Sequence, residues 1–365
     1  MEKRLLLIGS IFPPDIGGPA SFLAEFSQWC GAQCKSVQVV ATSESSDDNF
    51  EFGGVSHHLV RRSSLPLRTL RLILAIRFNY KPGSSILSVG AFIETFVALT
   101  GTKSKRSVKI PGDIVWERAR NNGLTKLDIL SFQNSKLPWR YRVFKHLFHL
   151  SLKSADLVIV PSVGIGELCE SWGVSPEKIA VVYNSVRPVP NLVGSKDSKY
   201  DLLTVCRLTR WKGVSEIIRA ASELNLSFAV VGDGPERYEL ELLARSCHAN
   251  VTFFGSLPRD RVFELFQESD FFILNSEYEG LPHVVLEARE MEIPIIARMG
   301  TGTDEVISHL ETGILVRGDS DSIREAIQIL QSSGELANLM TKKGKLDNRA
   351  RFNSELNFER ILGLI

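Results

Sequence analysis

Short runs of apolar residues alternate along this chain with longer segments in which apolar and polar residues are mixed. The apolar runs of the first half predict strands at 4–8, 36–41, 55–60, 84–88, 106–110, 156–160 and 179–182. The segments between them predict helices at 18–30, 66–79, 91–100, 138–153 and 163–172. Strands that alternate with helices are typical of a parallel sheet with helices on both faces. The first half is therefore predicted to be a doubly wound α/β domain.

The alternation stops and then starts again. Residues 184–199 contain two prolines and a polar run, which predicts an interdomain linker, and the Ser/Asp-rich stretch 42–49 predicts an exposed loop. The second half predicts strands at 200–205, 227–231, 250–254, 270–274, 294–297 and 313–316. It predicts helices at 213–224, 235–247, 258–268, 282–291, 303–309 and 320–331, and a helical tail at 335–363.

We therefore expect two doubly wound domains of similar size. The N-terminal domain covers residues 1–184 and the C-terminal domain residues 185–345, and a C-terminal helix within 346–365 is expected to pack back towards the N-terminal domain. Open α/β sheets bind ligands outside the carboxyl ends of their strands. The ligand is thus expected in a cleft between the two domains.

Charge is unevenly distributed along the chain. The whole protein has 365 residues, 44% of them hydrophobic, and a net charge of +1. Residues 1–185 contain 22 Lys and Arg against 15 Asp and Glu, a balance of +7, and the remainder has a balance of −6. A basic first half suits an anionic partner or a membrane surface. Scatter of ordinary surface charge is the alternative.

The chain has no feature that points to secretion or to a membrane span. Its five cysteines are odd in number and have no zinc-binding spacing, which favours reduced thiols. The first apolar run is too short for a signal peptide, and no run reaches the roughly 20 apolar residues that span a bilayer. We expect a cytoplasmic protein, and surface attachment to a membrane remains compatible with these patterns.

Two carboxylates lie close to a predicted loop-to-helix junction in the second half. Glu279 and Glu287 are eight positions apart, and Gly280 and Pro282 between them mark the start of a helix. The unpaired N–H groups of a helix start favour an anion in front of it. The segment therefore suits a ligand with a diphosphate in the middle and hydroxyl-bearing sugars at both ends.

Two cations follow the predicted strand at 200–205. Arg207 offers a bidentate fork and Lys212 a point charge, and together they would neutralise a diphosphate. They would also stabilise the negative charge that grows on a departing diphosphate. Taken alone, the two cations are better explained by a basic loop that caps the start of the next helix; the neighbouring Glu279 and Glu287 favour the diphosphate site.

The first half has its own candidates at strand ends. Gly17 and Gly18 follow the first predicted strand, where glycines let the backbone approach a phosphate or sugar closely. A tight loop without a ligand is the alternative. Asp113 follows the strand predicted at 106–110, where its carboxylate could bind a hydroxyl group of a sugar or acceptor. The alternative is an Asx-type turn made by the same side chain.

Two further glycine pairs resemble halves of a dinucleotide-binding motif, but neither completes it. Gly232 and Gly234 are interpreted as a structural turn. Gly300 and Gly302 are expected to open the helix predicted at 303–309, either with a structural role only or close to the donor. No residues are proposed as metal ligands.

Two segments outside the expected ligand site combine basic and large apolar residues. They are 61–77 and 136–148, and such segments suit contact with anionic lipid. Amphipathic helices packed inside a domain would have a similar pattern. The basic segments contain no recognised nucleic-acid-binding motif, so nucleic acid is not an expected partner.

With these residues assembled, the chain resembles the GT-B-fold glycosyltransferases, and specifically family 4 of the retaining enzymes. The resemblance covers nearly the whole length and is strongest over 200–318. It is carried by Cys-Arg207-Leu-Thr-Arg-Trp-Lys212-Gly, Val-Val-Gly232-Asp-Gly-Pro, Phe-Phe-Gly255-Ser-Leu257 and the Glu279 and Glu287 spacing, with Gly17-Gly18 and Pro-Gly-Asp113 in front. It implies two Rossmann-like domains that face each other across a deep cleft.

The resemblance also implies roles for individual residues. Arg207 and Lys212 would hold the donor diphosphate, Glu279 the transferred sugar and Glu287 the ribose. The backbone near Leu257 would meet the base, and Gly17 and Gly18 would approach the donor. The remaining donor contacts would come from the backbone of Gly280, Leu281, Pro282, His283 and Val284. Asp113 would be catalytic, although many relatives have a His-acidic pair where this chain has Gly112-Asp113.

The implied activity is transfer of a sugar, with retention, from a UDP- or GDP-linked donor to a glycan or polyprenyl-diphosphate-linked acceptor. A bacterial surface polysaccharide or lipopolysaccharide pathway, and attachment to the inner face of the cytoplasmic membrane, would fit it. The family's front-face displacement needs no side-chain nucleophile, no cofactor and no metal. Alternatives are a nucleotide-sugar epimerase or a phosphorylase of the same fold, or a non-catalytic nucleotide-sugar-binding subunit. A nicotinamide dehydrogenase is disfavoured by the incomplete glycine motifs.

Overall fold

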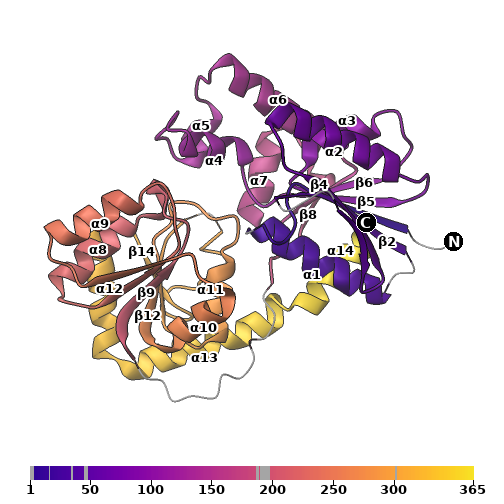
Figure 1. Ribbon diagram of the computed structural model, residues 1–365. Coiled ribbons are helices and arrows are strands. Elements are labelled where there is room, and N and C mark those ends of the chain that lie inside the picture. The colour runs from indigo at the N-terminus through magenta and orange to yellow at the C-terminus, as the bar shows by residue number, and fades with distance from the viewer. Residues whose placement is uncertain are drawn as a thin grey trace. The chain divides into compact units, whose positions relative to one another are not determined.

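The chain folds into two compact α/β units, each built on its own sheet. The structure is a computed structural model that describes residues 4–15, 17–33, 36–44, 48–185, 189, 198–300 and 302–365. Unit 1 comprises Met1–Asn122, Ser131–Val182 and Glu355–Ile365, and unit 2 comprises Gly123–Leu130 and Tyr183–Ser354. Figure 1 shows the elements of both units.

Unit 1 contains an eight-stranded sheet in the order β3-β4-β2-β1-β5-β6-β7-β8. Its strands are β1 (Arg4–Gly9), β2 (Ser36–Ser43), β3 (Asp48–Phe52), β4 (Val55–Arg61), β5 (Ser85–Val89), β6 (Arg106–Lys109), β7 (Leu157–Val160) and β8 (Ile179–Val181). All neighbours pair in parallel except β3, which runs antiparallel to β4. The central strands are buried on both faces, which is why they are continuous apolar runs in the sequence.

Helices cover both faces of this sheet (Figure 1). The helices of unit 1 are α1 (Gly18–Gln33), α2 (Leu65–Asn79), α3 (Phe92–Leu99), α4 (Ile114–Asn121), α6 (Trp139–Lys153), α7 (Val163–Ser171) and α14 (Ser354–Leu364), with a 3-10 turn η1 (Pro176–Lys178); α5 (Ile129–Gln133) begins in the Gly123–Leu130 segment of unit 2. On one face α1 and α14 share a core in which the rings of Phe26 and Phe358 lie 5.4 Å apart. On the other face α2 and α3 form a second core that includes Leu72, Ile76 and Ala98.

Unit 2 contains a six-stranded parallel sheet in the order β11-β10-β9-β12-β13-β14. Its strands are β9 (Tyr200–Val205), β10 (Phe228–Val231), β11 (Val251–Gly255), β12 (Ser269–Leu274), β13 (Ile295–Arg298) and β14 (Ile314–Val316). Its helices are α8 (Val214–Glu223), α9 (Arg237–Ser246), α10 (Arg259–Gln267), α11 (His283–Glu290), α12 (Ser320–Ser332) and α13 (Gly334–Arg351), with a 3-10 turn η2 (Arg210–Lys212). One core lies beneath α8, α9 and α12, and another beneath α10 and α11.

The two parallel α/β sheets confirm the predicted fold class, and every predicted strand is present. The linker predicted at 184–199 falls in part on 186–188 and 190–197, which lie outside the described residues. The predicted domain limits and the cleft stay predictions. Near the C-terminus, Phe358 and Ile361 of α14 belong to the core of unit 1.

Two expectations about elements are wrong. Residues 303–309 do not form a helix; Thr303 lies in a turn and Ile307 directly follows it, and both side chains are buried. The tail is helical as predicted, in two helices, because Phe352 ends α13 and inserts into the core of unit 2. The stretch 42–49 is not wholly a loop, since β3 begins at Asp48 and adds an exposed antiparallel edge to the sheet.

Each sheet has one position where the strand order reverses direction. In unit 1 this switch point lies between β1 and β5, and in unit 2 between β9 and β12. The connections that follow the two strands turn to opposite faces there, and ligands of open α/β sheets bind at such points. Gly17 follows β1, Arg207 follows β9, and Glu279 follows β12. The sequence candidates thus lie at the switch point of their own unit.

Among the helices in the described part of the chain, none combines the length and the apolar character that crossing a bilayer requires.

Candidate functional site

The switch point of unit 2 holds a closely paired lysine and glutamate. The Nζ atom of Lys212, at the end of η2, lies 2.5 Å from Oε1 of Glu279 in the loop after β12. Each side chain is only 16% exposed. The structure therefore brings together two residues 67 positions apart that the sequence predicted for one site.

Asn275 fixes the two loops that carry this pair. Its Nδ2 donates to the carbonyl of Gly213 at 2.9 Å and to that of Gly318 at 3.0 Å. The N–H of Glu277 donates to the carbonyl of Trp211 at 2.8 Å. Gly213 has φ +61°, and a Cβ there would lie 2.6 Å from Asn275. The side chain of Asn275 and the bare backbone of Gly213 together set the approach of Lys212 to Glu279.

A third loop supports Glu279 from its backbone side. Gly302 has φ +77°, and a Cβ on it would lie 2.4 Å from the carbonyl oxygen of Glu279 and 2.6 Å from that of Gly280. The guanidinium of Arg298, at the end of β13, lies 3.7 Å from Glu277. The expectation that Gly302 opens a helix is wrong, but its close approach to the site explains why a glycine is needed there.

Three residues separate Glu279 from the start of α11. Leu281 and Pro282 are buried, and Asn184 donates to the carbonyl of Leu281 at 3.2 Å. Pro282 is the N-cap residue, and the helix starts at His283 with no acidic side chain in its first turn. The N–H groups of a first helical turn have no partner within the helix, and the helix dipole favours an anion in front of them. The N–H of Val285 donates to the carbonyl of Pro282 at 3.1 Å, and an anion bound by the start of this helix stays a prediction.

Glu287 lies further along α11 and pairs with a residue that the sequence analysis missed. Nη2 of Arg259 lies 3.1 Å from Oε1 of Glu287. Arg259 is the first residue of α10 and follows Leu257 by two positions. Leu257 and Val284 both pack against the core beneath α10 and α11. The loop between β11 and α10 and the Glu287 carboxylate thereby lie side by side. The signal available in the sequence was a cation two positions after Leu257.

Arg207 and Cys206 follow β9 directly. Arg207 is exposed, and among the described residues no hydrogen bond or ion pair to its side chain is found. Burial raises the pKa of the Cys206 thiol to about 11; Lys212 opposes this shift and Glu279 adds to it. A thiol with so high a pKa stays protonated at neutral pH and is a poor nucleophile.

The turn at Gly232 and Gly234 packs against the same segment. A Cβ on Gly232 would lie 1.9 Å from the carbonyl oxygen of Cys206, and one on Gly234 would lie 2.3 Å from that of Leu208. Both glycines are therefore required by close backbone packing. This geometry agrees with the interpretation of this pair as a structural turn.

Three polar atoms in the loops after β9 and β12 have no hydrogen-bond partner within the described residues. They are Oγ1 of Thr209, Oδ1 of Asn275 and Oγ of Ser276, and all three are buried. Buried polar atoms are usually paired, because an unpaired one costs about 1–3 kcal/mol. The switch point therefore has hydrogen-bonding capacity that the protein itself does not use.

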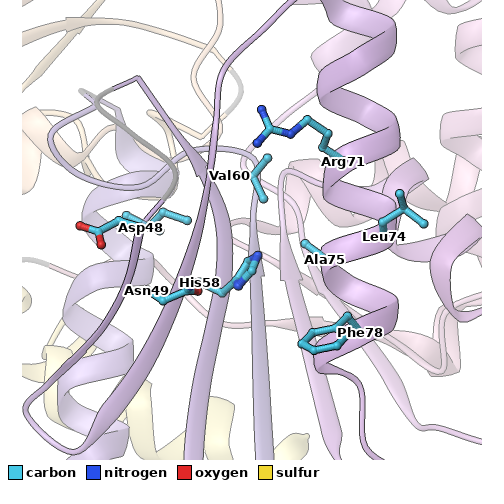
Figure 2. Close-up of a pocket in the computed structure, with 9 residues that line it drawn as sticks. Asp48, Asn49, His58, Val60, Arg71, Leu74, Ala75 and Phe78 are labelled. Carbon is cyan, nitrogen blue, oxygen red and sulfur yellow. The ribbon is translucent and has the colours of Figure 1, made fainter.

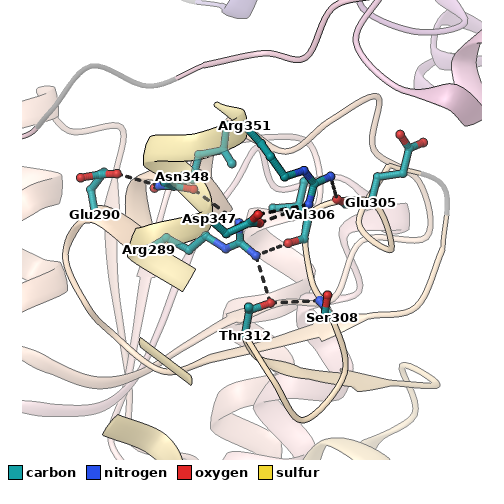
Figure 3. A network of polar contacts seen from close by, with 10 residues as sticks. Arg289, Glu290, Glu305, Val306, Ser308, Thr312, Asp347, Asn348 and Arg351 are labelled. Atoms are coloured by element: carbon teal, nitrogen blue, oxygen red, sulfur yellow. Dashed lines mark hydrogen bonds and ion pairs between the residues drawn. The ribbon is translucent and has the colours of Figure 1, made fainter. Parts of the chain in front are cut away.

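The opposite side of α11 holds a different charged cluster, shown in Figure 3. Arg289 is 1% exposed, and its guanidinium donates to Asp347 at 2.9 Å and to Thr312 at 3.0 Å. It also donates to the carbonyl of Val306, and Asn348 donates to the carbonyl of Leu286 at 2.8 Å. This network fixes α11 to α13 and to the turns around Val306.

In unit 1, Asp113 is held by its own neighbours. Its Oδ1 accepts from the N–H groups of Val115 at 2.9 Å and Trp116 at 3.0 Å, and its Oδ2 accepts from Gln133 at 2.9 Å. Asp113 is 1% exposed, and burial raises its pKa against the opposing effect of these hydrogen bonds and of Lys145. Of the two alternatives, this geometry favours the cap of α4, and the catalytic role of Asp113 stays a prediction.

The glycines after β1 begin a helix. Gly18 is the first residue of α1, and the N–H of Ser21 donates to the carbonyl of Gly17 at 3.1 Å. Their proposed approach to the donor stays a prediction. Within the described ranges, no group of three or more His, Cys, Asp or Glu side chains is arranged to hold a metal ion.

Part of the chain matches a family model and several curated proteins. Residues 190–347 match the family model described as glycosyl transferases group 1. The chain is 30% identical over 230 residues to N-acetyl-alpha-D-glucosaminyl L-malate synthase of Bacillus anthracis, covering 58% of this chain and 59% of that protein. It is 29% identical over 219 residues to the lipopolysaccharide core biosynthesis glycosyltransferase LpsD of Rhizobium meliloti, covering 58% and 63%. These matches span less than two thirds of the relatives' own lengths.

Solved structures match over almost the whole chain. Sucrose-phosphate synthase of Thermosynechococcus elongatus has a TM-score of 0.79 and 18% identity, covering 99% of this chain and 98% of that one. Anabaena Alr3699/HepE in complex with UDP-glucose has a TM-score of 0.75 and 16% identity, covering 98% of each chain. At this level of identity the likeness concerns the fold, and it confirms the expected GT-B class of two Rossmann-like units.

Proposed function

We propose that the protein is a glycosyltransferase that moves a sugar, with retention and without a metal, from a nucleotide-diphosphate donor to a glycan or lipid-linked acceptor. The observation that carries the proposal is the Lys212–Glu279 pair at the switch point of unit 2, with Glu279 in the loop that leads into α11. A cation, a carboxylate and a helix start in this order match the phosphate and the hydroxyl groups of such a donor.

The proposal assigns the two ends of the donor to the two ion pairs. Lys212 and Arg207 bind the diphosphate together with the backbone of Gly280 to Val284, and Glu279 accepts hydrogen bonds from the sugar. Glu287 accepts hydrogen bonds from the ribose, with Arg259 holding its carboxylate at 3.1 Å. The backbone at Leu257, two residues before Arg259, meets the base. Gly17 and Gly18 approach the donor from unit 1, and the cap of α4 is assigned to Asp113.

The chemistry follows from charge stabilisation. The bond between the anomeric carbon and the donor phosphate oxygen breaks, the acceptor hydroxyl oxygen bonds to the same face of that carbon, and the hydroxyl proton passes to the leaving phosphate. Lys212, Arg207 and the start of α11 stabilise the charge that develops on this phosphate. No side-chain nucleophile is needed, which is compatible with the protonated Cys206 thiol beside the pair.

Names of similar proteins support a choice of donor and pathway to test first. The HepE structure contains UDP-glucose, and LpsD is named for lipopolysaccharide core biosynthesis. We therefore propose a UDP-linked sugar as the first donor to test, with a GDP-linked sugar second. The proposed acceptor is a polyprenyl-diphosphate-linked glycan of a bacterial surface polysaccharide pathway, handled at the cytoplasmic face of the membrane.

The test is a transfer assay with purified protein, a panel of UDP- and GDP-sugars, and lipid extracts as acceptor. Donor binding is measured separately by thermal shift, because a ligand that binds the native state raises its apparent stability. We expect one donor to bind and to yield a glycosylated lipid with the donor's anomeric configuration by NMR, unchanged by EDTA. Conversion of the donor without acceptor would indicate an epimerase, and donor binding without any transfer would indicate a non-catalytic subunit.

A further inference from the structure

Helix α2 of unit 1 presents a stripe of large apolar residues to solvent. Its side chains Leu72, Ala75 and Ile76 face the sheet, as expected for a helix that covers a core. The opposite side carries Leu67, Leu70, Leu74 and Phe78, which are between 49% and 85% exposed. Their spacing of three and four residues places them on one face of the helix. A helix packed on a soluble core normally has a polar outer face, so this stripe requires another explanation.

Basic residues flank the stripe. Arg71 follows Leu70 and Arg77 precedes Phe78, so helical spacing places them on either side of the stripe, and α2 contains no Asp or Glu from Leu65 to Asn79. Arg side chains can place their apolar stems beside buried groups while the guanidinium stays in a polar layer. The combination of an apolar stripe with cations at its borders is typical of a helix that lies in a bilayer interface.

Helix α6 repeats this pattern. Trp139, 64% exposed, is followed by the exposed Val143 and Leu150 at helical spacing. Arg140 lies over the Trp139 ring at 5.5 Å, and α6 also has no acidic residue from Trp139 to Lys153. Trp is enriched at membrane interfaces because its ring is apolar while its N–H is polar.

The two helices belong to the same side of the unit 1 sheet. Both contact α3, which lies between them, and Figure 1 shows α2, α3 and α6 together on the face opposite α1 and α14. The acidic residue of α3, Glu94, is partly buried and accepts from Thr69 of α2 at 3.4 Å. This face therefore presents apolar and basic groups from two helices.

A hollow of about 440 Å³ continues this surface beside α2. Figure 2 shows Arg71, Leu74, Ala75 and Phe78 of α2 on one side of the hollow and His58 and Val60 of β4 on the other. Asp48 and Asn49 of the edge strand β3 complete it. The hollow borders the stripe on the side of Arg71, so a lipid that enters there meets apolar groups and a cation on the α2 side and the Asp48 carboxylate on the β3 side.

We propose that α2 and α6, with the hollow beside α2, form a docking surface for an anionic lipid bilayer. Only a bilayer interface offers both an extended apolar layer for the stripes and a dense negative charge for the arginines. The proposal goes beyond the proposed reaction, since it concerns unit 1 and holds for any activity of unit 2. For a lipid-linked acceptor, such docking would bring the enzyme to the surface that contains its substrate.

The test is co-sedimentation of the whole protein with vesicles of phosphatidylcholine, alone or mixed with equal phosphatidylglycerol. We expect binding to the anionic vesicles and much weaker binding to phosphatidylcholine. The double variant Leu70→Ser/Leu74→Ser should lower partitioning about tenfold through loss of buried apolar groups. Arg71→Gln/Arg77→Gln should lower it about tenfold at low salt and remove most of the salt dependence.

Matched controls lie on unit 2. Leu346 on α13 is 64% exposed, and the side chain of Arg317 is 73% exposed, so Leu346→Ser and Arg317→Gln make the same chemical changes away from α2 and α6. They should bind vesicles as the unchanged protein does. Thermal unfolding of each variant establishes that it is folded.

The proposal is overturned if the unchanged protein does not bind anionic vesicles, or if the stripe variant binds as well as its control. Self-association through α2, seen as a dimer that Leu70→Ser/Leu74→Ser dissolves without any vesicle binding, would also overturn it. Thermal shift with UDP and GDP on the same samples separates the two proposals. Vesicle binding without a nucleotide shift supports docking and counts against the proposed donor site.

Discussion

Unit 2 buries charged groups in two places, and the two differ in how completely the protein satisfies them. Arg289 uses both terminal nitrogens on Asp347, Thr312 and the carbonyl of Val306, and only its Nε has no hydrogen bond within the described chain. Lys212 and Glu279 face each other at 2.5 Å beside three buried polar atoms that have no partner in the described part of the protein.

The difference indicates what each cluster does. A buried cation with nearly all its donors used fixes the elements that supply the acceptors, and it has little left for a ligand. A close ion pair at a switch point has partly exposed charged groups that a polar ligand can bind, and the unpaired buried atoms in the same loops show that the protein has not satisfied this region as fully. Both clusters involve α11. The Arg289 cluster fixes α11 to α13, and the Lys212–Glu279 pair involves the loop that precedes α11. The first should therefore govern stability and the second activity.

The largest effect is expected from Arg289→Ala. This variant removes a buried guanidinium and leaves the carbonyl of Val306 and the hydroxyl of Thr312 without their donor, so the free energy of unfolding should fall by about 3–5 kcal/mol. The measurement is chemical denaturation of the purified variant, with turnover recorded per folded molecule. Arg351→Ala is the matched control, since Arg351 pairs with the same Asp347 at 3.2 Å but is 37% exposed, and it should cost about 1 kcal/mol or less. Equal losses for both variants would contradict the distinction.

Lys212→Met should have the converse effect. It removes the charge and keeps much of the side-chain stem, so transfer should fall about 100- to 1000-fold, as for loss of one group that stabilises a transition-state charge. The free energy of unfolding should fall by about 2 kcal/mol, less than in Arg289→Ala, because Glu279 loses its charged partner but no buried backbone acceptor loses a donor. Lys345→Met is the control, because Lys345 also lies 2.5 Å from a glutamate, Glu292, and should retain full turnover. Near-normal turnover of Lys212→Met would refute the proposed site.

Glu287→Gln should separate donor binding from chemistry. If Glu287 binds the ribose, the variant loses a hydrogen bond to a charged acceptor, and KM for the donor should rise about tenfold with kcat nearly unchanged. Arg259→Gln should shift KM in the same direction and less, because Arg259 acts by holding Glu287. Steady-state kinetics over a range of donor concentrations give both constants. A fall in kcat alone would place Glu287 in the chemical step instead.

The smallest effect is expected from Asp113→Asn, which extends the comparison to unit 1. Asparagine caps helices about as well as aspartate, so turnover should stay within about twofold, and the free energy of unfolding should fall by about 1 kcal/mol because the asparagine amide nitrogen cannot accept from Gln133. Asp113→Ala should cost about 1–2 kcal/mol in unfolding free energy through loss of the cap, while folded protein stays active. A large loss of turnover in folded Asp113→Asn would instead support the catalytic role of this carboxylate that the family resemblance implied.

Every strand that the sequence predicted is present in the structure, and the same apolar pattern by itself determined the fold class. Apolar runs of strand length report burial on both faces of a sheet, and the restart of the pattern after residue 199 reports a second sheet. The chemistry-bearing residues were also accessible, because loops after strands are where α/β proteins place them. Local signals failed where packing decides the backbone: 303–309 has helical periodicity but forms turns fixed by buried side chains.

Only the tertiary structure decided which charged residues meet. No local pattern pairs Arg259 with Glu287, or Arg289 with Asp347, since these contacts depend on strand order and on where α13 returns across α11. The same holds for Asp113, whose carboxylate the sequence offered equally to a ligand or to a turn, and whose neighbours then occupied both its oxygens. The chain's periodicity places groups at strand ends and on helix faces; long-range packing decides whether each group is left with capacity for a ligand.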